Sequence, residues 1–103
     1  MWRRVRLKEG VVVAGASPEI LLAILIAIPI FSSYESDLVI TSLVDGDHSP
    51  TSRHYIGMAV DFRIWYLKDK VELAAQDLRE ALGSDYYVRL EQTHMHVSYK
   101  PRR

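Results

Sequence analysis

The stretch from Ser52 to Asp61 places the strongest constraint on how this chain can fold. It sets an imidazole, His54, seven residues before the carboxylate of Asp61, with Gly57 between them. Residues 58–62 are mostly apolar and predict a buried strand. Because side chains alternate along a strand, this odd spacing would place His54 and Asp61 on opposite faces. We therefore expect a turn at Gly57 that brings both side chains to one side.

An imidazole nitrogen and a carboxylate oxygen are two of the three protein ligands of an open zinc site. The third ligand should come from elsewhere in the chain, and residues 93–96, Thr-His-Met-His, offer two imidazoles. On a strand, His94 and His96 share one face. The residues alone thus predict Zn2+ bound by His54, Asp61 and one of these two histidines.

These motifs resemble those of a known group of zinc peptidases. The chain matches Ser-x-His-x-x-Gly-x-Ala-x-Asp at all five fixed positions, and a His-x-His follows downstream. The matched positions are Ser52, His54, Gly57, Ala59 and Asp61. This pattern is similar to that of the D-Ala-D-Ala carboxypeptidase, lysostaphin and hedgehog group, which also contains many phage endolysins. The resemblance implies a zinc peptidase that cleaves peptidoglycan stem peptides, either as an endopeptidase or as a D,D-carboxypeptidase.

The resemblance leaves two patterns open for the third ligand. In relatives with His-x-His, the second histidine binds zinc and the first assists catalysis, which implies His96 as ligand and His94 as oxyanion donor. In relatives with Glu-x-x-His, the acid is the general base and the histidine is the ligand, and Glu91 with His94 fits this pattern too. We favour His54, Asp61 and His96 as the zinc ligands, with Glu91 as general base.

Two further features of this chain, compared with the relatives, concern substrate binding. In many carboxypeptidase relatives, the strand that corresponds to residues 40–42 leads to an arginine that binds the terminal carboxylate of the substrate. Here residues 43–45, Leu-Val-Asp, follow instead, which favours endopeptidase action unless Arg53 or Arg63 takes that role. His48 lies in a polar segment where relatives often carry a loop over the metal, and a solvent-exposed histidine is the alternative.

The whole chain, residues 1–103, is expected to form a single α+β domain. A first helix should begin with Ser17 as N-cap and end or kink at Pro29, and a second should run from Tyr66 to Leu82. Strands are expected at residues 11–13, 37–43, 58–62, 84–91 and 93–99, with a tight hairpin at Gln92. The expected fold is a small antiparallel sheet that carries the zinc site and is flanked by two helices.

Charge and composition limit the partners. Lysine and arginine number 13, as do aspartate and glutamate, so no net field favours nucleic acid. The absence of cysteine excludes disulfides and thiolate metal ligands. The apolar run at residues 20–31 is shorter than the roughly 20 residues that a membrane span needs. We expect a monomer without a signal peptide that acts on peptidoglycan at the bacterial cell wall.

The basic N-terminus suggests either a solvated edge strand or tail, or attraction to an anionic cell wall. Two other functions remain open beside the peptidase. A hedgehog-like site can keep zinc and bind a partner without catalysis, and the same fold could serve as a structural part of a virion. An intact general base distinguishes the enzyme from the binding module.

Overall fold

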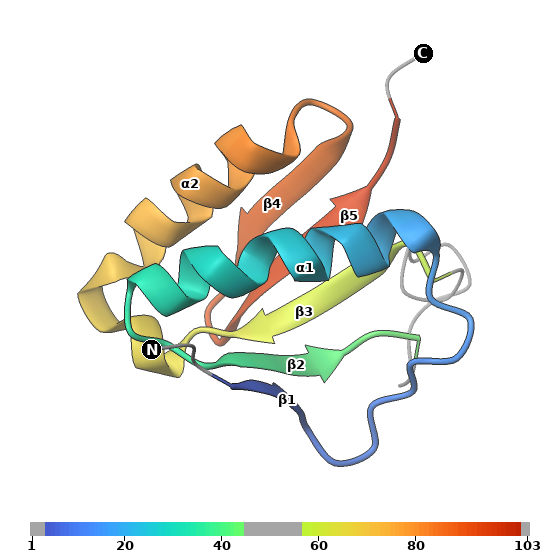
Figure 1. The fold of residues 1–103 in the computed structure, drawn as a ribbon, viewed down its shortest axis with the longest axis horizontal. Coiled ribbons are helices and arrows are strands. Elements are labelled where there is room, and N and C mark those ends of the chain that lie inside the picture. The colour runs from blue at the N-terminus through green and yellow to red at the C-terminus, as the bar shows by residue number, and fades with distance from the viewer. Residues whose placement is uncertain (1–3, 45–56, 102–103) are drawn as a thin grey trace.

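The computed structural model describes residues 4–44 and 57–101, which form a small α+β domain as predicted (Figure 1). The strands are β1 (Val5–Leu7), β2 (Leu38–Ser42), β3 (Ala59–Arg63), β4 (Tyr86–Leu90) and β5 (His94–Tyr99). The helices are α1 (Pro18–Ser33), the 3-10 helix η1 (Trp65–Lys70) and α2 (Val71–Leu82).

The five strands form one mixed sheet in the order β1-β2-β3-β5-β4. The pairs β2–β3, β3–β5 and β5–β4 are antiparallel, whereas β1 runs parallel to β2. The prediction of an antiparallel sheet is therefore wrong at this edge. Parallel neighbours need a long crossover connection, and α1 supplies it between β1 and β2.

The edge strand β1 replaces the strand that we predicted at residues 11–13, which form no ladder. All three residues of β1 are exposed. Arg4 precedes the strand, and Arg6 lies between its two apolar residues. The backbone N–H of Arg4 donates to Asp37 Oδ1 at 3.0 Å, which fastens the start of β1 beside β2. Short, basic edges of this kind discourage further strand pairing. The described part of the basic N-terminus is thus a solvated edge strand, one of the two expectations.

Helix α1 begins as predicted but continues through Pro29 to Ser33. The Oγ atom of Ser17 accepts a hydrogen bond from the backbone N–H of Ile20 at 3.2 Å, and Pro18 occupies the first turn. A proline inside a helix removes one backbone hydrogen bond. Burial of Phe31, two residues beyond Pro29, offsets this cost because its side chain is 0% exposed. No helix of the described residues is long and apolar enough to cross a membrane.

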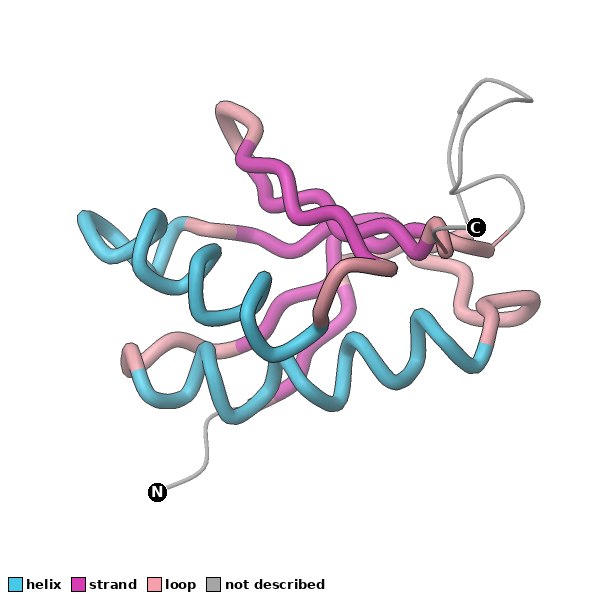
Figure 2. The backbone as a smooth tube through the Cα atoms, turned by 90° about the horizontal axis from the view of Figure 1, so that it is seen from above, coloured by secondary structure: helices cyan, strands magenta, loops and turns pink. Residues whose placement is uncertain are grey.

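Both α-helices cover the same face of the sheet (Figure 2). The strands bury alternate residues beneath them: Leu38, Ile40, Val60, Phe62, Val88, Met95 and Val97. Phe31 of α1 meets Phe62 of β3 edge to face, with ring centroids 5.6 Å apart. By the same alternation, the opposite face receives Asp61, His94 and His96, and neither α1 nor α2 covers it.

The second predicted helix is divided in two. Lys68 has φ 56° and ψ −124°, so the chain forms η1 first and α2 only from Val71. Leu82 ends α2 as predicted, and Gly83 follows with a positive φ of 86°. The backbone N–H of Gly83 donates to the carbonyl of Arg79 at 3.0 Å, which satisfies one of the last helical carbonyls.

Tyr86 ties β4 to α1, and its loss should destabilise the fold. Its hydroxyl donates to the carbonyl oxygen of Glu19 at 2.9 Å, and burial raises the pKa of Tyr86 above the ordinary value of 10.0. We expect Tyr86→Phe to lower the free energy of unfolding by about 1 kcal/mol, the usual net worth of a hydrogen bond. Urea denaturation at pH 8 would measure this loss.

The raised pKa of Tyr86 also predicts how the stability of the fold changes at alkaline pH. The unfolded chain loses the phenolic proton first, so native stability falls as pH rises above the unfolded value. Denaturation repeated above that value should show a smaller alkaline loss for Tyr86→Phe than for the parent chain. Tyr87→Phe, at an exposed position of the same strand, is the matched control. Equal alkaline losses in the two variants would contradict the assignment.

Candidate functional site

Strands β3 and β5 bring Asp61, His94 and His96 together on the sheet face that α1 and α2 leave uncovered. Asp61 lies directly opposite His96 in the strand register, and Arg63 lies opposite His94. Because side chains alternate along each strand, all four share one face. Residues that are more than 30 positions apart in sequence thus become neighbours through strand pairing alone.

The carboxylate of Asp61 lies between the two imidazoles. Its Oδ1 is 2.9 Å from His96 Nδ1, and its Oδ2 is 3.7 Å from His94 Nε2. Asp61 is 8% exposed, and the side chains of His94 and His96 are 31% and 15% exposed. A buried carboxylate is costly unless polar groups compensate it, and here the imidazoles do so.

The separation of the donors of Asp61 and His96 lies near that of two ligands on one zinc ion. Zinc binds nitrogen and oxygen at about 2.0–2.2 Å, so two donors of one tetrahedral site lie about 3.3 Å apart. The observed separation of Nδ1 and Oδ1 is 2.9 Å, which is that of a hydrogen bond, so the two atoms would have to move slightly apart and Nδ1 would have to give up its proton to admit the ion. The donor types, a neutral imidazole and a carboxylate, are also those that zinc accepts.

The third predicted ligand, His54, lies outside the described residues, as do His48 and Arg53. Within residues 4–44 and 57–101, no group of three His, Cys, Asp or Glu side chains is arranged to hold a metal ion. The predicted ligand set requires His54 in addition to Asp61 and His96, so it stays a prediction.

Gly57 lies in a turn, as expected, with a positive φ of 76°, whereas His54, which this turn was expected to bring to the side of Asp61, lies outside the described residues. Its carbonyl oxygen accepts a hydrogen bond from the backbone N–H of Ser17 at 3.0 Å, so the turn is fastened to the start of α1. A Cβ atom at this position would lie 2.2 Å from the carbonyl oxygen of Gly15. The position thus requires glycine for its backbone conformation and for the close approach of Gly15.

We expect Gly57→Ala to lower the free energy of unfolding by about 2–4 kcal/mol, from the left-handed backbone and the overlap together. The overlapping atom belongs to the backbone, so no side-chain rotation relieves the clash. Chemical denaturation would measure the loss. Gly10→Ala is the matched control, because Gly10 has φ +90° but nothing within 4 Å of its added Cβ. Equal losses of unfolding free energy in both variants would show that the close approach of Gly15 contributes nothing to the effect of Gly57→Ala.

A cleft of about 360 Å³ opens beside Asp61 and His94. Its other lining residues are Lys8, Thr41, Ser42, Arg63, Trp65 and Thr93. The Arg63 guanidinium lies over the Trp65 ring, 3.9 Å from the ring centroid, in a cation–π contact. Lys8 and Arg63 give the cleft two positive charges next to Asp61, so it suits a ligand with a carboxylate or a polarised carbonyl group.

Glu91 lies beside His94 in the β4–β5 hairpin. Its backbone N–H donates to the carbonyl of His94 at 2.8 Å, and Leu90 lies opposite Met95. The turn at Gln92 thus puts Glu91 on the same face as His94 and His96, although their sequence spacing alone would separate them. Its Oε1 accepts a hydrogen bond from Arg89 Nε at 2.7 Å, and its side chain is 38% exposed. Arg89 therefore holds the carboxylate of the predicted base in this structure.

Lys8 was not predicted as a cleft residue, nor was the stacking of Arg63 on Trp65. Arg63 follows Asp61 by two positions on one strand, so alternation could have placed it on the site face. Lys8 gave no local signal, because its position depends on the pairing of β1 with β2. Comparisons with protein-family models, with curated proteins and with solved structures found no match for this chain.

Proposed function

We propose that this protein is a zinc-dependent peptidase that cleaves peptidoglycan stem peptides, with His54, Asp61 and His96 as the metal ligands. The observation that carries the proposal is the 2.9 Å approach of His96 Nδ1 to Asp61 Oδ1, beside a cleft that His94 also lines. The resemblance of residues 52–61 and 93–96 to the D-Ala-D-Ala carboxypeptidase, lysostaphin and hedgehog group supplies the substrate class. When bound, zinc would activate a water molecule and polarise the scissile carbonyl.

His94 is proposed to stabilise the oxyanion through Nε2. Its Nδ1 lies 3.2 Å from the hydroxyl oxygen of Thr93, which orients the ring. If the Thr93 hydroxyl donates to Nδ1, the ring proton of the neutral imidazole is on Nε2. Nε2 is also the nitrogen that faces Asp61, so this tautomer directs an N–H donor toward the proposed reaction centre.

Glu91 is proposed as the general base that takes a proton from the attacking water and passes it to the leaving amine. Its place opposite His94 in the hairpin supports this role. The carboxylate must first exchange its hydrogen bond with Arg89 for one with water. Ion pairs between such exposed groups are weak, about 0–1 kcal/mol, so the exchange is energetically accessible.

Lys8 and Arg63 are proposed to bind anionic groups of the stem peptide. Both line the cleft, where charge-assisted hydrogen bonds to carboxylates would orient the substrate. Arg63 is available for the terminal carboxylate that the arginine of carboxypeptidase relatives binds. Because Arg63 lines the cleft, the proposal includes carboxypeptidase action as well as endopeptidase action.

A non-catalytic zinc module that binds a partner is the second candidate. The hydrogen bond between Arg89 and Glu91 favours it, because a carboxylate that stayed with Arg89 could not serve as a base. Catalysis would then be absent even though the metal ligands were complete.

Incubation of the zinc-loaded chain with purified muropeptides, read by mass spectrometry, would test the proposal. Hydrolysis of one bond adds the mass of one water molecule to the summed mass of the products. The masses of the individual fragments identify the bond that was cleaved. Asp61→Ala, treated with the same zinc, is the inactive control. A folded, zinc-loaded chain that leaves all muropeptides intact would reject the peptidase and support the binding module.

A further inference from the structure

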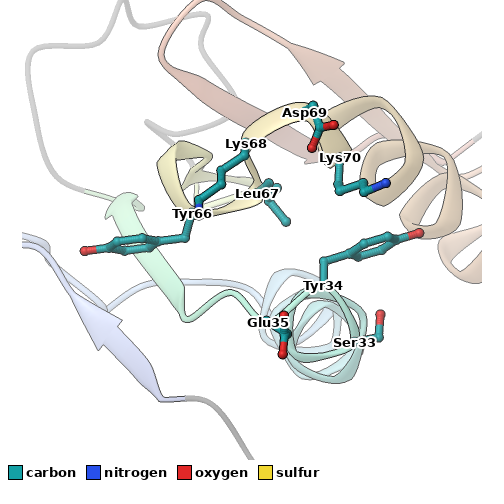
Figure 3. Close-up of a pocket in the computed structure, with 8 residues that line it drawn as sticks. All are labelled: Ser33, Tyr34, Glu35, Tyr66, Leu67, Lys68, Asp69 and Lys70. Carbon is teal, nitrogen blue, oxygen red and sulfur yellow. The ribbon is translucent and has the colours of Figure 1, made fainter.

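A second cavity, of about 660 Å³, lies between the end of α1 and η1 (Figure 3). Residues 33–35 form one wall and residues 66–70 form the other. Leu67, which is 1% exposed, belongs to the hydrophobic core and gives the cavity an apolar floor. The volume lies within the range of about 300–1,000 Å³ that small-molecule sites occupy. This cavity shares no lining residue with the cleft beside Asp61.

The two walls carry opposite charge. Glu35 lies on the α1 wall, whereas Lys68 and Lys70 lie on the η1 wall with Asp69 between them (Figure 3). Within residues 4–44 and 57–101, the side chains of these four residues make no hydrogen bond or ion pair with one another or with other residues. The charges are therefore available to a ligand that enters the cavity.

The end of α1 strengthens the negative wall. Its last turn contains no basic residue, so no side chain offsets the partial negative charge of the helix C-terminus. Glu35 follows directly and adds a full negative charge. A cationic group would thus be favoured at this wall, and an anionic group at the η1 wall, where the two positive charges of Lys68 and Lys70 exceed the one negative charge of Asp69.

Backbone strain marks both walls. Glu35 and Lys68 are the two non-glycine residues with positive φ in the described part of the chain. At Glu35, φ 59° belongs to the left-handed turn that ends a helix. At Lys68, φ 56° with ψ −124° lies outside the left-handed helical region, and such costly conformations cluster at ligand clamps.

We propose that this cavity binds a zwitterionic ligand of dipeptide size. The ammonium group of the ligand faces Glu35 and the end of α1, and its carboxylate faces the η1 wall, where the ammonium groups of Lys68 and Lys70 point to different sides (Figure 3). This arrangement gives each terminal charge of a short peptide an opposite partner on the nearer wall. The site is independent of the zinc ligands and of peptidase activity.

An NMR titration of the full chain would test this site with three probes: alanyl-alanine, its N-acetyl derivative and its C-terminal amide. We expect saturable shifts at the amides of Glu35, Lys68 and Lys70 with alanyl-alanine. Each derivative lacks one charge and should bind up to about fivefold more weakly, since an exposed ion pair supplies at most about that factor. Equal binding of the three probes, or no saturable shift, would overturn the proposal.

Two charge-removing variants make the test site-specific. Glu35→Gln and Lys68→Met should each weaken alanyl-alanine binding about fivefold, whereas Lys68→Arg should preserve it. Glu72→Gln and Lys100→Met, at exposed positions that do not line the cavity, are the matched controls. Thermal melting would verify that every variant is folded. Shifts confined to Asp61, His94 and His96 would place the peptide in the other cleft and reject the second site.

Discussion

Asp61→Ala and His96→Ala are each expected to lose stoichiometric zinc, and His94→Ala is expected to keep it. Asp61 Oδ1 and His96 Nδ1 already lie 2.9 Å apart, so removal of either donor leaves an incomplete ligand set. Loss of groups that merely support a ligand costs about 10- to 100-fold in affinity, so loss of a ligand itself should exceed that range. Elemental analysis of the purified variants would measure the bound metal.

The same experiment decides between the two histidines. His54→Ala should lose zinc in either case, whereas Glu80→Ala removes an exposed carboxylate from α2 and should retain it. If His94→Ala loses zinc and His96→Ala keeps it, the Glu-x-x-His pattern is the correct one. Full zinc in Asp61→Ala would reject the proposed centre altogether.

Acidic pH should weaken the same site. Imidazole ligands bind metal in their neutral form, so protons compete with zinc for His54 and His96. Zinc that binds only the folded chain raises its melting temperature, and this rise should shrink as the pH falls. An equal zinc-dependent rise at acidic and neutral pH would contradict imidazole ligation.

Local sequence signals predicted the elements that depend on neighbouring residues. Ser17 and Pro18 mark the start of α1, and Gly83 follows the end of α2, because caps act within one turn. Of the two outcomes expected at Pro29, an end or a kink, the end did not occur, because burial of Phe31 outweighs a local helix breaker. Tertiary packing decided that outcome, and no local pattern reports it.

The same distinction applies to the sheet and the site. Alternation predicted that His94 and His96 share a face, and the register of β3 with β5 adds Asp61 to it. The parallel pairing of β1 with β2 and the cleft residue Lys8 were not predicted, because they follow from pairing between distant segments. Gly57 was expected to form a turn, but the contact with Gly15 that excludes a side chain depends on the folded backbone.

Glu91→Gln is expected to keep zinc and the fold but to lower turnover of muropeptides by about 10²- to 10⁴-fold. An amide cannot accept the proton that the proposed base removes from water. His94→Ala should lower turnover by about 10²- to 10³-fold, because it removes the proposed oxyanion donor. Steady-state rates on the bond identified by mass spectrometry would measure both losses.

The control for Glu91→Gln is Glu72→Gln, which makes the same chemical change at an exposed position of α2 and should leave turnover unchanged. The structure opposes the catalytic role of Glu91 more than that of His94, because Oε1 of Glu91 already accepts a hydrogen bond from Arg89 Nε at 2.7 Å. If Glu91→Gln retains full turnover while His94→Ala loses it, the base is not Glu91, and the hairpin carboxylate only pairs with Arg89. If the parent chain binds zinc but neither it nor any variant cleaves a muropeptide, the metal serves a binding module, and His94 and Glu91 have no catalytic role.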